Sequence, residues 1–156
     1  MKDIAMIPGI AKTTQLPISA ARRPFVGRKV LLVDPNPRDL EYYRSVLLGQ
    51  GHQVRTCAVY ADGALLLHRD RFDLIIVSQG SRNFEGRLLV ERAVEIDRRM
   101  PVLVLTECLD MGCYLEAMQL GAADYVEKPL GPVDVARLLE THVRRDDQMG
   151  RAAGAA

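Results

Sequence analysis

The chain is 156 residues long, enough for one domain of ordinary size with short tails, and its net charge is +1. Hydrophobic residues make up 48% and charged residues 26%, which is typical of a globular protein with one core, and no run of about 18 apolar residues suggests a membrane span. The 3 cysteines form no C-x-x-C pair and keep no metal-ligand spacing with the histidines. They argue against a disulfide framework and favour a reducing, cytoplasmic location.

The amino-terminal segment, residues 1–27, differs in composition from the rest of the chain. It contains Pro8, Pro17 and Pro24 and shows no sustained hydrophobic periodicity, which predicts a loosely ordered arm. Up to residue 29 the only acidic residue is Asp3, whereas six residues are basic: Lys2, Lys12, Arg22, Arg23, Arg28 and Lys29. Because these charges are widely spaced, we expect a solvated tail, with contact to nucleic acid as the alternative.

The first predicted unit is a strand, a tight turn and a helix. Lys29–Val33 is a short apolar run of the kind that is buried on both faces of a parallel sheet. In the turn that follows, Asn36 can cap a helix and Pro37 suits its first position. Gly51 is expected to end this helix in a left-handed conformation. Its inward positions, at helical spacing, are Leu40, Tyr43 and Leu47.

The same alternation of strand and helix continues along the chain. Further strands are predicted at residues 53–58, 73–77, 101–105 and 124–127. The helices between and after them are marked by apolar residues. Leu65 and Leu66 are expected to turn inward, as are Val135, Leu138, Leu139 and Val143; the helices between these carry Leu88, Leu89, Val90, Ala93, Val94 and Ile96, and then Met111, Leu115 and Met118, of which Met111 and Met118 are expected in the core or at its rim. From about Asp146 the chain is expected to be frayed. Alternating strands and helices predict an α/β fold, doubly wound around a parallel sheet.

Four residues that can carry chemistry follow the predicted strands directly. They are Asp34, Ser78, Thr106 and Lys128. In an open parallel sheet the ligand site lies outside the carboxyl ends of the strands, so these side chains are the candidates for a shared site. Each one alone is explained as a loop or strand-end residue, but the four together favour a single site.

The segments around these positions resemble the receiver domains of bacterial response regulators. They read VDP at residues 33–35, FDLIIVS at 72–78, PVLVLT at 101–106 and GAADYVEKPL at 121–130, and the last is the most specific match. The resemblance covers residues 28–145. It implies a flavodoxin-like fold, with five parallel strands in the order 2-1-3-4-5 and helices on both faces, and leaves 146–156 as a tail.

The sequence departs from the family at the positions that carry the family's chemistry. The residue that accepts phosphate in the family is an aspartate, and here it is Ser78. The second member of the acidic pair after the first strand is Pro35. The residue whose carbonyl helps to bind metal in the family is Gly80. We therefore interpret the chain as an atypical receiver that lacks the acceptor aspartate.

These substitutions predict a pocket without phosphotransfer. A serine hydroxyl is neutral and needs a base, and the nearest base, Asp34, is expected to pair with Lys128 and to be weakly basic. Mg²⁺ prefers several oxygen ligands, whereas only Asp34 remains as a weak candidate, so we expect no cofactor and no metal. Glu107 is a second candidate partner for Lys128, which would fix a charge cluster; the alternative is an exposed carboxylate.

The resemblance also implies a role and a partner surface. We expect a stand-alone receiver that acts in two-component signalling by binding a histidine kinase, an output protein or a second copy of itself, and that is not an enzyme. The family's usual surface corresponds to the helix from Met111 to Gly121, strand 124–127 and the last helix, beside the switch-like aromatic Tyr125. Phosphorylation at Ser78 or nearby is the first alternative. A nucleotide- or flavin-binding enzyme is a weaker one, because no glycine-rich phosphate loop follows any predicted strand.

Overall fold

The computed structural model of the chain describes the backbone of residues 27–155 and the side chains of residues 27–143. The predicted basic arm, apart from Gly27, lies outside the described residues. The strands are β1 (Lys29–Val33), β2 (Gln53–Cys57), β3 (Leu74–Ser78), β4 (Val102–Thr106) and β5 (Asp124–Glu127). The helices are α2 (Pro37–Gly49), α3 (Tyr60–Arg69), α4 (Arg87–Ile96), α5 (Met111–Leu120) and α6 (Pro132–Ala155).

The five strands form one parallel sheet in the order β2-β1-β3-β4-β5, as predicted. The three central strands are buried on both faces, which explains their continuous apolar runs. Val33 lies beside Val77 in the register, and Ser78 lies beside Leu105. The register therefore brings the residues after β1 and β4 next to Ser78, at one edge of the sheet.

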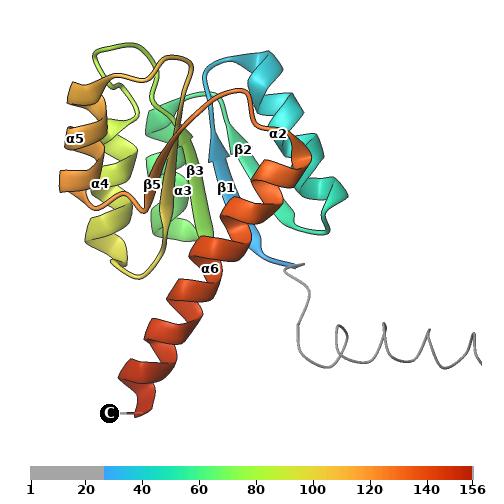
Figure 1. Ribbon diagram of the computed structural model, residues 1–156, viewed down its shortest axis with the longest axis vertical. Helices are drawn as coiled ribbons and strands as arrows, with labels where there is room; N and C mark the ends of the chain where they lie inside the picture. The colour runs from blue at the N-terminus through green and yellow to red at the C-terminus, as the bar shows by residue number, and fades with distance from the viewer. Residues whose placement is uncertain (1–26, 156) are drawn as a thin grey trace, which may run out of the picture.

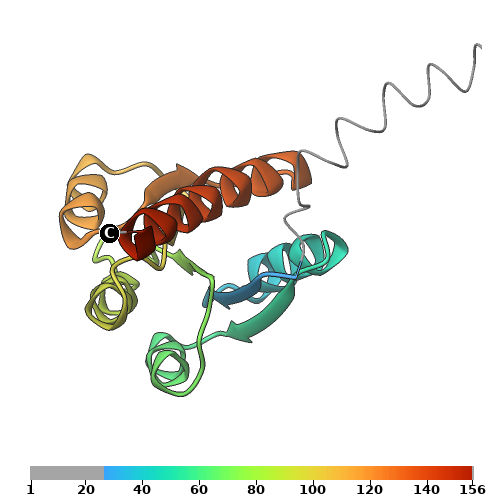
Figure 2. The same ribbon diagram turned by 90° about the horizontal axis from the view of Figure 1, so that it is seen from below.

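Helices cover both faces of the sheet in a three-layer arrangement. Helices α2 and α6 lie on one face, and α3, α4 and α5 lie on the other (Figures 1 and 2). Each face has its own apolar core: one includes Tyr43, Leu47 and Leu139, and the other includes Leu67, Leu89 and Ala117. None of the helices within residues 27–155 is both long and apolar enough to cross a membrane.

The first turn of α2 forms as the sequence predicts. The side chain of Asn36 accepts hydrogen bonds from the backbone N–H groups of Arg38 and Asp39, at 2.9 and 3.3 Å. Pro37 occupies the first helical position, where a missing N–H removes no helical hydrogen bond. At the other end Gly51 has φ +89°, the left-handed conformation that glycine adopts without strain. The Asn36 cap at the start of α2 fixes where Asp39 lies.

Leu65 does not turn inward as predicted, because a small residue of α3 faces the sheet in its place. Leu65 is 57% exposed and Met111 is 70% exposed. Leu88, Ile96, Leu115 and Met118 are exposed as well. In α3 the buried residues are Gly63 and Leu67, and a Cβ on Gly63 would lie 2.9 Å from a Val33 methyl carbon. At Gly63 the helix approaches the sheet so closely that a side chain has no room there.

The last helix is longer than the sequence suggested, since residues from about Asp146 were expected to be frayed. Helix α6 does not end near residue 145 but continues to Ala155, and in Figure 1 it runs past the sheet. The segment contains no proline and is rich in alanine, the strongest helix former. Its two glycines, Gly150 and Gly154, suggested fraying, but they do not stop the helix.

Candidate functional site

The four residues predicted at the strand ends come together at one edge of the sheet. Asp34, Ser78 and Thr106 are buried, with 2%, 7% and 1% of their surface exposed. The Lys128 side chain is 6% exposed. Backbone hydrogen bonds fix the positions of two of these residues next to the sheet. The Asp34 N–H donates to the Cys57 carbonyl at 3.0 Å, and the Lys128 N–H donates to the Thr106 carbonyl at 2.7 Å. The arrangement is a small, polar and largely water-excluded site.

The ammonium group of Lys128 is the centre of this site. Its Nζ lies 2.8 Å from Asp34 Oδ2 and 2.9 Å from Asp39 Oδ2, and it lies 3.4 Å from the Ser78 hydroxyl oxygen. Burial alone lowers the pKa of a lysine, but the hydrogen bonds and negative charges of the two carboxylates outweigh it, and the pKa of Lys128 is raised. The lysine is therefore held in its charged form.

Asp39 is a site residue that the sequence reasoning missed. It lies in the first turn of α2, and its side chain is 29% exposed. An acidic residue in a first helical turn is commonly explained by the helix dipole, so its residue type alone did not single it out. The signal was present in the Asn36 cap, since a helix that begins directly after β1 must project its first turn over the carboxyl ends of the strands.

Glu107, the second candidate partner for Lys128, is the exposed carboxylate that we gave as the alternative. Within residues 27–143, the carboxylates that pair with Lys128 belong to Asp34 and Asp39, whereas Glu107 is exposed and forms no ion pair there. The physical reason is that Asp39 already fills the second position beside the ammonium group. Pro35, at the family's second acidic position, is exposed as well.

A tyrosine at the start of α3 forms a hydrogen bond with the backbone of Ser78, the residue at the acceptor position. The Tyr60 hydroxyl donates to the Ser78 carbonyl at 2.9 Å. Burial, together with the nearby negative charges of Asp34 and Glu85, raises the pKa of Tyr60 to about 12. Gly80 has φ +86°, and a Cβ there would lie 2.5 Å from Glu85 Oε1 and 3.0 Å from the Tyr60 hydroxyl. Gly80, the position whose carbonyl helps to bind metal in the family, thus has no room for a side chain beside Tyr60 and Glu85.

Thr106 and Tyr125 also have their hydrogen bonds within the fold. The Thr106 hydroxyl donates to the Cys108 carbonyl at 2.8 Å and accepts from the Cys108 N–H at 3.2 Å. The Tyr125 hydroxyl donates to the Gln79 side chain and accepts from the Asp110 N–H at 3.3 Å. Burial raises the pKa of Tyr125. The Tyr125 ring therefore lies in a buried position with defined partners.

Comparison with known proteins identifies the family. The family model described as "Response regulator receiver domain" matches residues 30–140, well over half of the chain. The chain belongs to this family. Asp34, Ser78, Thr106 and Lys128 all lie within the matched segment of the receiver domain.

Curated relatives of the receiver domain are longer than this chain. It is 28% identical over 129 residues to the response regulator PleD of Caulobacter vibrioides, and the aligned part covers 81% of this chain and 28% of PleD. It is 30% identical over 118 residues to the virulence transcriptional regulatory protein PhoP of Salmonella typhimurium, which covers 76% of this chain and 53% of the relative. The chain therefore spans less than two thirds of either relative.

Solved structures agree on the fold of the receiver domain. A response regulator receiver domain protein from Methanospirillum hungatei superimposes with a TM-score of 0.74 at 20% identity, over 79% of this chain and 98% of that one. A receiver domain from Clostridium thermocellum gives a TM-score of 0.71 at 22% identity, over 78% of this chain and 98% of that one. At these identities the likeness shows the fold alone.

The oxygen atoms of this receiver site that could bind a metal do not fit an octahedral Mg²⁺ ion. Asp34 Oδ1 accepts from the Asn36 N–H at 2.9 Å and Asp34 Oδ2 accepts from Lys128, while Asp39 is also bound to Lys128. Mg²⁺ requires near-ideal octahedral geometry with carboxylate, phosphate and water oxygens. A cation entering here would have to displace the Lys128 ammonium group from both carboxylates.

Proposed function

We propose that this receiver domain acts in two-component signalling as a protein-interaction module that does not depend on phosphorylation. The observation that carries the proposal is the position of Lys128, which lies between the carboxylates of Asp34 and Asp39 beside a neutral Ser78 hydroxyl. The ammonium group of Lys128 is therefore already bound to two carboxylates within the fold, and the neutral Ser78 hydroxyl offers it no stronger partner.

The chemistry of the acceptor position supports this proposal. An aspartate attacks a phosphoryl donor as a carboxylate that is already ionised at neutral pH. Ser78 would have to lose a proton to a base, and both nearby carboxylates are already engaged in ion pairs with Lys128. We therefore propose that Ser78 is not a phosphoryl acceptor and that the domain uses no cofactor and catalyses no reaction.

The surface that would bind a partner is the one formed by α5, β5 and α6. Five large apolar side chains are exposed on α5 and just before it: Leu109, Met111, Tyr114, Leu115 and Met118. Contiguous exposed apolar side chains of this kind often mark protein interaction sites. We propose that this surface binds a signalling protein, a kinase, an output protein or a second copy of the chain.

Treatment with acetyl phosphate and Mg²⁺ tests the proposal. We expect the intact mass of the wild-type protein to remain unchanged, because the hydroxyl lacks a base and the carboxylates lack a free site for the metal. The Ser78→Ala variant, treated in parallel, provides the matched control. A mass increase of one phosphoryl group in the wild type that is absent in Ser78→Ala would establish the alternative, a receiver phosphorylated on serine.

A further inference from the structure

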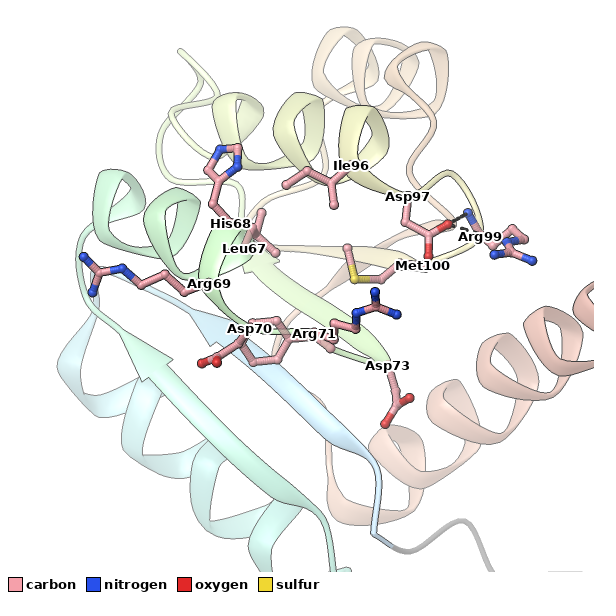
Figure 3. A pocket seen from close by; sticks show the side chains of 11 residues that line it. Leu67, His68, Arg69, Asp70, Arg71, Asp73, Ile96, Asp97, Arg99 and Met100 are labelled. Carbon is pink, nitrogen blue, oxygen red and sulfur yellow. Dashed lines mark hydrogen bonds and ion pairs between the residues drawn. The ribbon is translucent and has the colours of Figure 1, made fainter.

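A second cavity lies at the opposite edge of the sheet from Lys128. It has a volume of about 650 Å³, within the range of small-molecule pockets. It opens between the end of α3 and the end of α4, where the chain turns into β3 and β4 (Figure 3). Its lining comes from residues 67–73 and from Ile96, Asp97, Arg99 and Met100. None of these residues belongs to the site around Lys128.

The floor of this cavity is apolar. Leu67, Phe72 and Met100 are buried side chains that line it, and Ile96 forms an exposed wall. The ammonium group of Lys29 lies 5.4 Å from the centre of the Phe72 ring, which places a positive charge beside the floor. A ligand with an apolar body could cover this surface.

The carboxylates that line the cavity already have partners. Asp70 forms an ion pair with Arg55 at 3.2 Å. Asp97 accepts from the Arg99 N–H at 2.9 Å and lies 3.7 Å from its guanidinium group. The Asp73 carboxylate accepts from the Lys29 N–H at 2.8 Å. The negative charges of the cavity are thus engaged in the fold.

Arg71 is an exposed lining residue whose guanidinium group lies in the cavity. Its side chain lies across the middle of the cavity toward Met100, whereas Arg69 points outward (Figure 3). No hydrogen bond or ion pair joins the Arg71 side chain to any other residue in the described part of the chain. A guanidinium group in this position can offer a planar pair of donors to an anion.

We propose that this cavity is a binding site for a small organic anion with an apolar body, in which Arg71 binds the anionic group and the Phe72–Met100 floor binds the rest. The site is independent of the proposed signalling role, since it shares no residue with the Lys128 pocket or with the exposed apolar residues of α5. A ligand of this class would bind at the amino-terminal ends of the strands and give the domain a second site through which a signal could act.

Anilinonaphthalene sulfonate, a fluorescent aromatic anion, is a suitable probe. We expect saturable binding to the wild-type protein and about a tenfold or greater weakening in Arg71→Ala, because a charge-assisted hydrogen bond is lost. Arg98→Ala is the matched control: Arg98 is exposed and does not line the cavity, but its loss changes the net charge equally. We expect that variant to change the affinity less than twofold. Melting temperatures of both variants, and an Arg71→Gln variant, separate a binding effect from a folding effect.

Methyl NMR of methionine-labelled protein shows where the probe binds. We expect the Met100 methyl signal to shift as the probe is added, while the signals of Met111 and Met118 on α5 remain in place. Shifts at Met111 and Met118 without one at Met100 would overturn the proposal. Equal weakening in Arg71→Ala and Arg98→Ala, or the absence of saturable binding, would overturn it too.

Discussion

Replacement of Lys128 by alanine is expected to lower the free energy of unfolding by about 3–5 kcal/mol. The variant leaves the Asp34 carboxylate, whose side chain is 3% exposed, without a counter-charge in a water-excluded site. Asp39, 2.9 Å from the same ammonium group, loses its partner as well. Breaking one side of a buried ion pair in this way costs far more than losing an exposed pair. Urea unfolding at neutral pH measures the loss.

Two further variants separate the ion-pair effect from a loss of packing. Arg38→Ala removes an exposed positive charge in the same helical turn as Asp39 and should change stability by less than about 0.5 kcal/mol. The triple variant Asp34→Asn, Asp39→Asn and Lys128→Met removes all three charges and should regain most of the lost stability. A loss below about 1 kcal/mol in Lys128→Ala would contradict the assignment of Lys128 as the central charge of the pocket.

The pH dependence of this effect has a definite sign. The pKa of Lys128 is raised in the folded protein above its ordinary value of 10.5. Its contribution to stability is therefore complete below the unfolded-state value and is lost as the pH rises through the folded-state value. The contribution of this lysine predicts that the free energy of unfolding differs between wild type and Lys128→Ala by a constant amount from neutral to mildly alkaline pH. The difference should shrink only in strong alkali.

The second large effect is a gain of metal binding and of phosphorylation. The double variant Pro35→Asp and Ser78→Asp is expected to bind Mg²⁺ and to accept a phosphoryl group from acetyl phosphate. It restores the acidic pair and supplies an ionised nucleophile beside Lys128, where the wild type has a proline and a hydroxyl. Without metal the crowded carboxylates should make this variant less stable than the wild type.

Binding and phosphorylation of the double variant are measured separately. Free Mg²⁺ at about 100 times its Kd should stabilise the variant by about 2.7 kcal/mol, seen as a rise in Tm that the wild type does not show. The control variant Pro35→Asn and Ser78→Asn has similar side-chain volumes without the charges, and we expect neither a Mg²⁺ effect nor a mass increase. A double variant that stays unphosphorylated would mean that something other than the missing carboxylates blocks the pocket.

The sequence predicts the strands and the four strand-end residues well, for a physical reason. Buried parallel strands require continuous apolar runs, and the sheet register then places Asp34, Ser78, Thr106 and Lys128 at one edge whatever the helices do. What identified the site was therefore the position of each residue relative to a strand rather than its type.

The sequence could not predict the residues that complete the site from helices and loops. Asp39 contacts Lys128 because the Asn36 cap turns α2 directly over the strand ends. Tyr60 reaches the Ser78 carbonyl from the start of α3, 18 residues earlier in the chain. Such contacts depend on how the helices sit on the sheet, which hydrophobic periodicity does not encode. The same limit explains why Gly63 faces the sheet where Leu65 was expected.

The central claim is that the pocket around Lys128 stays in one state because its ammonium group is already bound to the carboxylates of Asp34 and Asp39. Amide NMR spectra of the wild-type protein, recorded before and after addition of Mg²⁺ and acetyl phosphate, test it most directly. We predict that the signals of Ser78, Thr106, Tyr125 and Lys128 keep their positions. A second set of signals for these residues, growing as acetyl phosphate is added, would contradict the claim and identify a receiver that still switches.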